Sequence, residues 1–311
     1  MKKKISIVTP TYNEESNIEK LCNLIADEMK KLNYDYEHIV IDNCSSDSTV
    51  SILKKLALSN KNLKIIVNTR NFGHIKSPIH GILQANGDAV ILMSSDFQDP
   101  VSLIPTYLEE WEKGNKVVMA QKSGSDENMR LYFIRKLFYK IIRLISETPL
   151  LLNTTGAGLF DRKIIEEVRS INDPYPYFRG LVSEITSEIK LIKFHQPKRE
   201  GGKTKYNFYT LYDMAVLGII KHSKLPLRIL TFIGMITSFL SLIVATVYFF
   251  YKLFYWESFE IGVAPLVIGF FFIASIQIFL LGFIGEYVMN ILTHSRKLPL
   301  VIEKERINFK D

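Results

Sequence analysis

Two apolar stretches near the C-terminus decide the architecture of this chain: ILTFIGMITSFLSLIVATVYFFY at residues 229–251 and IGVAPLVIGFFFIASIQIFLLGFIG at residues 261–285. Neither contains a charged residue, and charged residues bound each of them on both sides. At about 1.5 Å per residue, helices of these lengths reach about 34 and about 37 Å, which is enough to cross a hydrocarbon core of about 30 Å with some tilt. The two stretches therefore predict a helical hairpin in a membrane, preceded by a water-soluble domain.

The charges around the hairpin predict its orientation. The connecting segment 252–260 contains two acids and one base, whereas bases flank the outer ends at Lys221, Lys224, Arg228, Arg296, Lys297, Lys304 and Arg306. Because cytoplasmic flanks of membrane helices carry an excess of Lys and Arg, both flanks are expected in the cytoplasm. We therefore predict a cytoplasmic domain at residues 1–224 and a membrane region at 225–293. The two membrane spans are expected at about 227–252 and about 261–291, and a cytoplasmic tail at 294–311.

The net charge of the chain indicates which chemical classes of partner it favours. The net charge of +7 and pI of about 9.1 favour phosphate-bearing partners such as anionic lipids, lipid phosphates or nucleotides. Nucleic acid is not expected, because no basic helix or RNA-binding signature stands out. Cys22 and Cys44 lack the spacing of a metal site, so they are expected to be ordinary small core or loop residues. The N-terminus leads into a short strand-like run and has no signal-peptide core, so it is expected to stay on the side where it is made.

The first 120 residues alternate between strand and helix patterns. A capping box at Ser16–Glu19 predicts one helix start, and Pro100 predicts another. Short apolar strands are predicted at residues 5–9, 37–41, 64–67, 89–93 and 117–120. This alternation indicates a doubly wound α/β sheet of the Rossmann-like type, whose ligands bind beyond the carboxyl ends of the strands.

Polar clusters follow four of these strands, at residues 10–14, 42–47, 70–73 and 94–99. Any one cluster can be explained as an ordinary polar loop in which Asp or Ser caps the next helix. Four clusters at one edge of a sheet favour a shared binding site instead. Neither G-x-G-x-x-G nor a Walker A motif is present, which disfavours the nucleotide-binding folds that carry them.

Two basic segments suggest contact with lipid. Residues 129–147 mix basic and apolar residues, which predicts an amphipathic helix lying in the membrane interface; the alternative is a helix packed on the sheet with a solvated basic rim. Residues 196–206 form a Gly-rich basic loop, which predicts a phosphate clamp; the alternative is a solvated loop.

Taken in order, these residues resemble those of membrane-anchored family 2 glycosyltransferases that move sugars onto polyprenyl phosphates, such as bactoprenol glucosyltransferases and dolichol-phosphate mannose synthases. The resemblance covers nearly the whole chain. It is carried by Pro10-Thr-Tyr-Asn-Glu-Glu15, Ile41-Asp42 through Asp47, Arg70-Asn-Phe-Gly73, Asp96-Phe-Gln-Asp-Pro100, Arg199 with Gly202-Lys-Thr-Lys205, Pro226-Leu-Arg228 and Gly285-Glu-Tyr287.

The resemblance implies a GT-A fold, a UDP- or GDP-sugar donor, a divalent metal (Mg²⁺ or Mn²⁺), inversion at the sugar carbon, and a possible homo-oligomer. It assigns roles residue by residue. The nucleotide sugar would be held by Pro10, Tyr12, Glu14, Asp42, Asp96 and Gln98; the metal by Asp96 and Gln98; and the acceptor phosphate by Arg199, Lys205 and, as a weaker candidate, Lys122. Asp96 is the predicted catalytic residue. Undecaprenyl phosphate is the expected acceptor if the source is bacterial.

This chain departs from the family pattern at two places. Ser94 stands where the family usually has the first Asp of Asp-x-Asp, and residues 155–158 lack the acid of the usual Gly-Asp-Phe-Arg, with Asp161 nearby but out of register. Two alternatives to the main interpretation therefore remain: transfer to another lipid-linked glycan, or a non-catalytic membrane scaffold that kept the fold. The retained polar cluster favours an enzyme.

Overall fold

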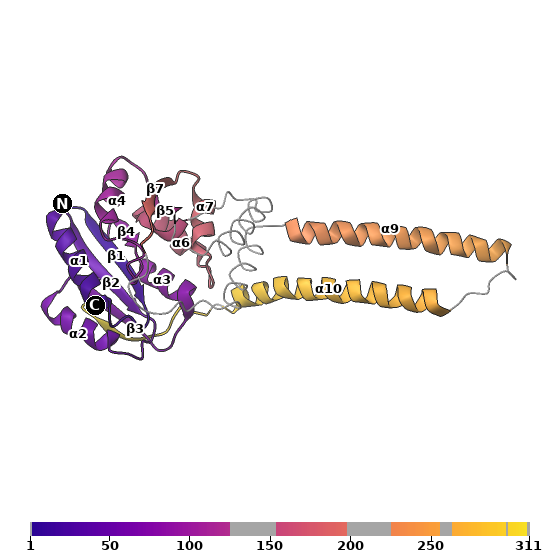
Figure 1. Cartoon of the computed structure of the whole chain (residues 1–311), viewed down its shortest axis with the longest axis horizontal. Helices are drawn as coiled ribbons and strands as arrows, with labels where there is room; N and C mark the ends of the chain where they lie inside the picture. Colours follow the sequence, from indigo (N-terminus) through magenta and orange to yellow (C-terminus); the bar gives the residue numbers. More distant parts are fainter. Residues whose placement is uncertain (1, 125–153, 198–224, 256–262, 297, 310–311) are drawn as a thin grey trace.

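The structure is a computed structural model that describes residues 2–124, 154–197, 225–255, 263–296 and 298–309. Figure 1 shows an α/β domain at one end, from one side of which project two long helices, α9 (Leu225–Phe254) and α10 (Val263–Ser295). The predicted amphipathic helix at 129–147 lies outside the described residues, as do residues 198–206 of the predicted phosphate clamp, with Arg199 and Lys205.

A single mixed sheet organises the α/β domain, with the strand order β7-β5-β6-β4-β1-β2-β3-β8. Its centre, β4-β1-β2-β3, is parallel, while β6 and β8 run antiparallel to their neighbours. The strands are β1 (Lys4–Thr11), β2 (Asp35–Asp42), β3 (Leu63–Asn68), β4 (Ala89–Leu92), β5 (Val117–Gly124), β6 (Thr154–Asp161), β7 (Lys190–His195) and β8 (Glu303–Ile307).

Helices cover both faces of the sheet, because apolar side chains point to both sides of the central strands. On β1, Ile7 packs among residues of α1 and α4, whereas its neighbour Val8 packs among residues of α3 and α6. The helices of the first face are α1 (Ile18–Lys31), α2 (Thr49–Ser59) and α4 (Leu103–Glu112); those of the second are α3 (Gly73–Leu83), α6 (Arg162–Ile171) and α7 (Phe178–Ile185). Burial of each such Ile, Leu or Val contributes about 1.5–3 kcal/mol to the stability of the fold. The two helix layers therefore hold the strands, and the loops at their ends, in place.

Two helix starts differ from the prediction. The expected capping box at Ser16–Glu19 does not form: α1 begins at Ile18, and the side chain of Asn17 donates to Glu14 Oε2 (2.8 Å) instead of capping the helix. The helix α4 begins at Leu103 rather than at Pro100, because the chain first makes a turn in which the Leu103 N–H donates to the Pro100 carbonyl oxygen (3.0 Å).

The strand β6 was not predicted and separates β4 from β5. Its sequence TTGAGLFD has two glycines, so it lacks the apolar run that marks the central strands. Gly158 is needed there, because a Cβ at this position would lie 2.3 Å from the carbonyl oxygen of Val118 on β5. Close approach of two strands, rather than local strand preference, therefore explains this element.

The C-terminal tail also belongs to the sheet, where the sequence suggested only a cytoplasmic segment. The strand β8 pairs antiparallel with β3, and Ile302 just before it accepts hydrogen bonds from the Thr69 N–H (2.9 Å) and Oγ1 (3.0 Å). After β8, the Asn308 side chain donates to the carbonyl oxygens of Ala57 (2.9 Å) and Leu63 (2.8 Å). The tail thus covers what would otherwise be the open edge of β3.

A helix occupies each of the two predicted spans. In the part of the chain that the structure describes, one segment, Phe272–Ser295 within α10, is long and apolar enough to cross a membrane by length and composition. The two-span topology and the cytoplasmic orientation remain predictions.

Candidate active site at the carboxyl edge of the sheet

The central strands bring together three of the predicted binding segments. Pro10 lies at the end of β1, and Thr11 pairs in register with Asp42, the last residue of β2. The strand β4 flanks β1 on the other side, so the loop that contains Asp96 and Gln98 starts at the same edge. Residues more than 80 positions apart therefore meet at one sheet edge, as the strand pattern predicted.

Hydrogen bonds join the loop after β1 to the loop after β2. The Asn13 N–H donates to Ser45 Oγ (2.8 Å), and the Ser46 N–H donates back to Asn13 Oδ1 (2.8 Å). The Glu14 N–H donates to Thr49 Oγ1 (2.9 Å). These hydrogen bonds join the two loops into one wall, which includes Tyr12.

Asp42 is fully buried at this wall. Burial raises the pKa of its carboxyl group, against the hydrogen bonds that Ser45 donates from Oγ (2.5 Å) and N–H (2.9 Å), and the nearby Asp47 carboxylate raises the pKa further. A buried carboxyl group that its own loop holds in one orientation can form a hydrogen bond to a polar group of a ligand.

Left-handed backbone occurs in all three of these loops. Asn13, Cys44 and Phe97 have φ angles of 54°, 66° and 59°. Such conformations cost non-glycine residues energy, of order 1–3 kcal/mol at unfavourable positions, and they persist where the surrounding structure enforces them. Their coincidence at three adjacent strand ends supports a functional site at this edge.

Asn43 connects this wall to the loop after β3, a role that was not predicted from the sequence. Its Oδ1 accepts from the Phe72 N–H (2.9 Å) and from Asn68 Nδ2 (3.2 Å), while its Nδ2 donates to Asn71 Oδ1 (2.8 Å). The exposed Arg70 guanidinium lies 4.4 Å from the centre of the Phe72 ring. Asn43 therefore fixes the loop that presents Arg70.

The loop after β4 contains the predicted metal-binding residues. Asp96 Oδ1 accepts from the Gln98 N–H (3.2 Å). Ser94, which stands at the family's first acidic position, donates from Oγ to Asp99 Oδ2 (2.7 Å). Asp99 is a second carboxylate of this loop, and its motif alone did not predict this contact with Ser94.

These groups fit a divalent cation held mainly by its substrate. Asp96 and Gln98 offer a carboxylate and an amide oxygen, which are the hard ligands that Mg²⁺ and Mn²⁺ prefer. Within the described ranges, no three His, Cys, Asp or Glu side chains converge as a metal cage. Because Mg²⁺ usually binds through one or two carboxylates plus substrate phosphates, a sparse set of this kind is compatible with it.

Two further candidate site residues, Lys122 and Asp161, lie at opposite edges of the sheet. Lys122, in β5, is partly buried and reaches the same edge two strands beyond β4. Asp161 lies at the opposite edge, where it pairs in register with Ala89, caps α6 through the Lys163 N–H (3.0 Å) and accepts from Trp111 Nε1 (2.8 Å). Asp161 therefore does not replace the acid missing from residues 155–158.

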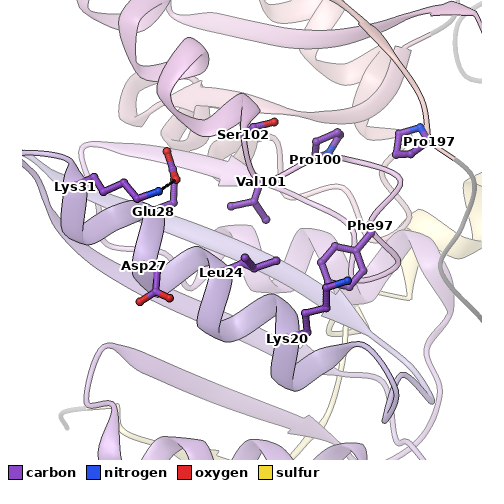
Figure 2. A pocket seen from close by; sticks show the side chains of 10 residues that line it. All are labelled: Lys20, Leu24, Asp27, Glu28, Lys31, Phe97, Pro100, Val101, Ser102 and Pro197. Carbon is purple, nitrogen blue, oxygen red and sulfur yellow. Dashed lines mark hydrogen bonds and ion pairs between the residues drawn. The ribbon is translucent and has the colours of Figure 1, made fainter.

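A cavity of about 410 Å³ lies behind the Asp96 loop, between α1 and the start of α4 (Figure 2). Leu24, Phe97 and Val101 provide its apolar surface, and the ion pair of Lys31 with Glu28 (2.8 Å) lies along its rim. None of the predicted donor, metal or acceptor residues lines this cavity. It adjoins the candidate site through the backbone of Phe97.

The sequence is similar to those of known glycosyltransferases. Residues 6–169 match the family described as glycosyl transferase family 2. An uncharacterized glycosyltransferase of Synechocystis sp. is 32% identical over 96% of this chain and 94% of its own length. A prophage bactoprenol glucosyl transferase homolog of Escherichia coli is 29% identical over 97% of this chain and 98% of its own.

Among solved structures, one similar chain is glucosyl-3-phosphoglycerate synthase from Mycobacterium tuberculosis, crystallised with Mn²⁺, UDP and phosphoglyceric acid. It is 17% identical, with a TM-score of 0.49, over 70% of this chain and 76% of its own.

Proposed function

The chain is a member of glycosyltransferase family 2 with a GT-A-like fold, and from this premise we propose that it moves a single sugar from a UDP- or GDP-sugar to a polyprenyl phosphate, with inversion at the sugar carbon. One observation carries the choice of acceptor: relatives named as bactoprenol glucosyl transferases match 97% of this chain, including the apolar helices. In a bacterium the acceptor would be undecaprenyl phosphate.

The donor would bind at the wall formed by the loops after β1 and β2. Pro10, Tyr12, Glu14 and Asp42 are the proposed nucleotide-binding residues, and the rigidity of these loops supports that role. Glu14 Oε2 accepts from Asn17 Nδ2 (2.8 Å), and this bond fixes the orientation of the carboxylate for that role.

Asp96 and Gln98 would hold Mg²⁺ or Mn²⁺ together with the donor diphosphate. When bound, the cation would stabilise the negative charge of the departing diphosphate. Asp96 is the proposed essential carboxylate. Ser94, bonded to Asp99, supports the spacing of this loop without adding a charge.

The acceptor needs positioning more than deprotonation. A phosphate monoester has its second pKa near 6, so it is already largely an anionic nucleophile at pH 7. Arg199, Lys205 and Lys122 are the proposed groups that neutralise and orient it. This requirement is consistent with Ala157 at the position where the family usually has an acid.

Transfer would take place at the cytoplasmic face of a membrane, with α9 and α10 as the anchor. The apolar segment Phe272–Ser295 supports membrane association, and the basic flanks of the hairpin support a cytoplasmic domain.

The direct test uses the purified full-length protein in a neutral detergent. Label transfer is measured from a panel of UDP- and GDP-sugars to undecaprenyl phosphate, with and without Mg²⁺ or Mn²⁺. We expect a lipid-linked monosaccharide whose anomeric configuration is opposite to that of the donor. Transfer only to a preformed lipid-linked glycan, or no transfer to any lipid, would refute the proposed acceptor.

A further inference from the structure

Two cations lie over the tyrosine rings of one loop, residues 172–177, which connects α6 to α7. The Lys76 Nζ is 5.5 Å from the centre of the Tyr175 ring, and the Arg179 Cζ is 5.6 Å from the centre of the Tyr177 ring. Lys76 belongs to the first turn of α3 and Arg179 to the first turn of α7. Different elements thus direct positive charge at the same loop.

Neither cation is neutralised by a carboxylate of the described residues, whereas many other basic side chains of the domain are. Arg169 on α6, for example, pairs with Glu166 at 2.6 Å. A tyrosine ring attracts a cation but does not cancel its charge. Burial lowers the pKa of Lys76, and the nearby Arg70 guanidinium lowers it further, so a bound anion would favour the charged form of Lys76.

Arg179 is held in place beside the candidate active site. Its Nη1 donates to the carbonyl oxygen of Thr154 (2.8 Å), the first residue of β6. Thr154 pairs with Gln121 of β5, whose next residue is the proposed acceptor-binding Lys122. A guanidinium has five N–H donors, so one bond to Thr154 fixes the group and leaves donors available for a ligand.

The same loop touches the end of α10. Asp173, the one carboxylate in the sequence of this loop, accepts from the Tyr175 N–H (2.9 Å) and lies 3.6 Å from His294 Nε2. The apolar segment of α10 ends at Ser295, one residue further along. Figure 1 shows α3 and α7 on the side of the domain from which α9 and α10 project. Phosphates of membrane lipids are expected at this level.

We propose that Lys76 and Arg179, each over a tyrosine ring of the loop 172–177, form a binding subsite for the phosphate of the lipid acceptor. The chemical class of the ligand is a lipid phosphomonoester. This inference rests on the proposed function and adds a subsite between the end of α10 and the edge where Lys122 lies. A planar guanidinium matches phosphate oxygens in a two-pronged geometry that lysine cannot reproduce.

The test compares Arg179→Ala, Arg179→Lys and Lys76→Ala with the matched controls Arg169→Ala and Lys163→Ala in the full-length protein. For each alanine variant we expect the KM for undecaprenyl phosphate to rise about tenfold or more, while the Kd for the nucleotide sugar changes less than about twofold. Arg179→Lys should lie between wild type and Arg179→Ala, which distinguishes loss of recognition from loss of folding. An unchanged acceptor KM, or an equal loss of donor affinity, would overturn the proposal.

A binding experiment separates this subsite from general attraction to lipids and from the proposed function. Binding of fluorescent undecaprenyl phosphate in neutral detergent should weaken in Arg179→Ala and Lys76→Ala but not in the controls, and excess phosphatidylglycerol should compete poorly. If the variants lose only their affinity for phosphatidylglycerol vesicles, the pair binds bulk anionic lipid and the proposal is wrong. If the wild type transfers no sugar, the proposed function fails, and this binding measurement still decides the subsite.

Discussion

Glu37 offers the most quantitative test of how the sheet is held together. This residue of β2 has a side chain that is 2% exposed, and four groups donate hydrogen bonds to it. Its Oε2 accepts from Lys4 Nζ (2.8 Å) and Lys64 Nζ (2.6 Å), and its Oε1 accepts from Ser6 Oγ (2.6 Å) and the Asn86 N–H (2.8 Å). Replacing Glu37 by Gln keeps the shape of the side chain but removes its charge.

The size of the effect follows from the pKa. Burial alone would raise the pKa of Glu37, but the hydrogen bonds from Lys4, Lys64, Ser6 and Asn86 outweigh burial and lower the pKa to about 2 from 4.5. Lowering the pKa of Glu37 from 4.5 to about 2 corresponds to about 3 kcal/mol of stability. Because the folded-state pKa is lowered, this stability is present above pH 4.5 and is lost as the pH falls toward 2.

The assay is thermal unfolding in detergent at a fixed scan rate. At pH 7 we expect Glu37→Gln to lower the Tm by about 6–12 °C. At pH 4 the unfolded chain is mostly protonated at this position and the folded chain is not, so the difference between wild type and variant should shrink by about 0.8 kcal/mol. The control is Glu109→Gln, which removes an exposed pair with Lys113 and should change little. Equal stability at pH 7, or a difference that grows on acidification, would refute the reasoning.

Four further outcomes are expected. Asp96→Asn should abolish turnover while leaving the Tm unchanged, because it removes the proposed metal carboxylate; near-normal turnover that still requires a divalent metal would assign the ligand elsewhere. Arg199→Ala and Lys205→Ala should each raise the acceptor KM by a factor equivalent to about 1.5–3 kcal/mol with little change in donor Kd; the opposite pattern in titrations would place their loop on the donor diphosphate. Gly158→Ala should destabilise the domain by several kcal/mol, since its Cβ would lie 2.3 Å from a backbone oxygen of β5, and an unaltered melting curve would contradict that contact. A chain that ends at Ile302 lacks β8 and should aggregate more readily in light-scattering measurements; a monodisperse, fully stable protein would show that β8 is dispensable.

The central half of the fold could be predicted because local and global signals agree there. Each of the strands β1 to β4 is a short apolar run followed by a polar cluster, and parallel strands place those clusters at one edge. Pro10, Asp42 and Asp96 were therefore assigned to a common edge from sequence, and the structure confirms that they share it.

The remaining elements depend on partners far away in the chain. The strand β6 forms because Gly158 permits close approach to β5, and β8 (EKERI) forms because its backbone pairs with the distant strand β3. Asn43 and Arg179 were missed for the same reason. Their roles depend on Phe72 and Thr154, and nothing in the local sequence marks those contacts.

The position of β8 has a consequence for biosynthesis. Its residues are synthesised more than 230 residues after the β3 residues with which they pair. Until then β3 is an open edge, and the chain between them includes both long apolar helices. The catalytic sheet is therefore completed only after α10 has been made and the chain has returned to β3. A nascent chain that stalls before β8 therefore presents an unpaired strand edge to chaperones and proteases.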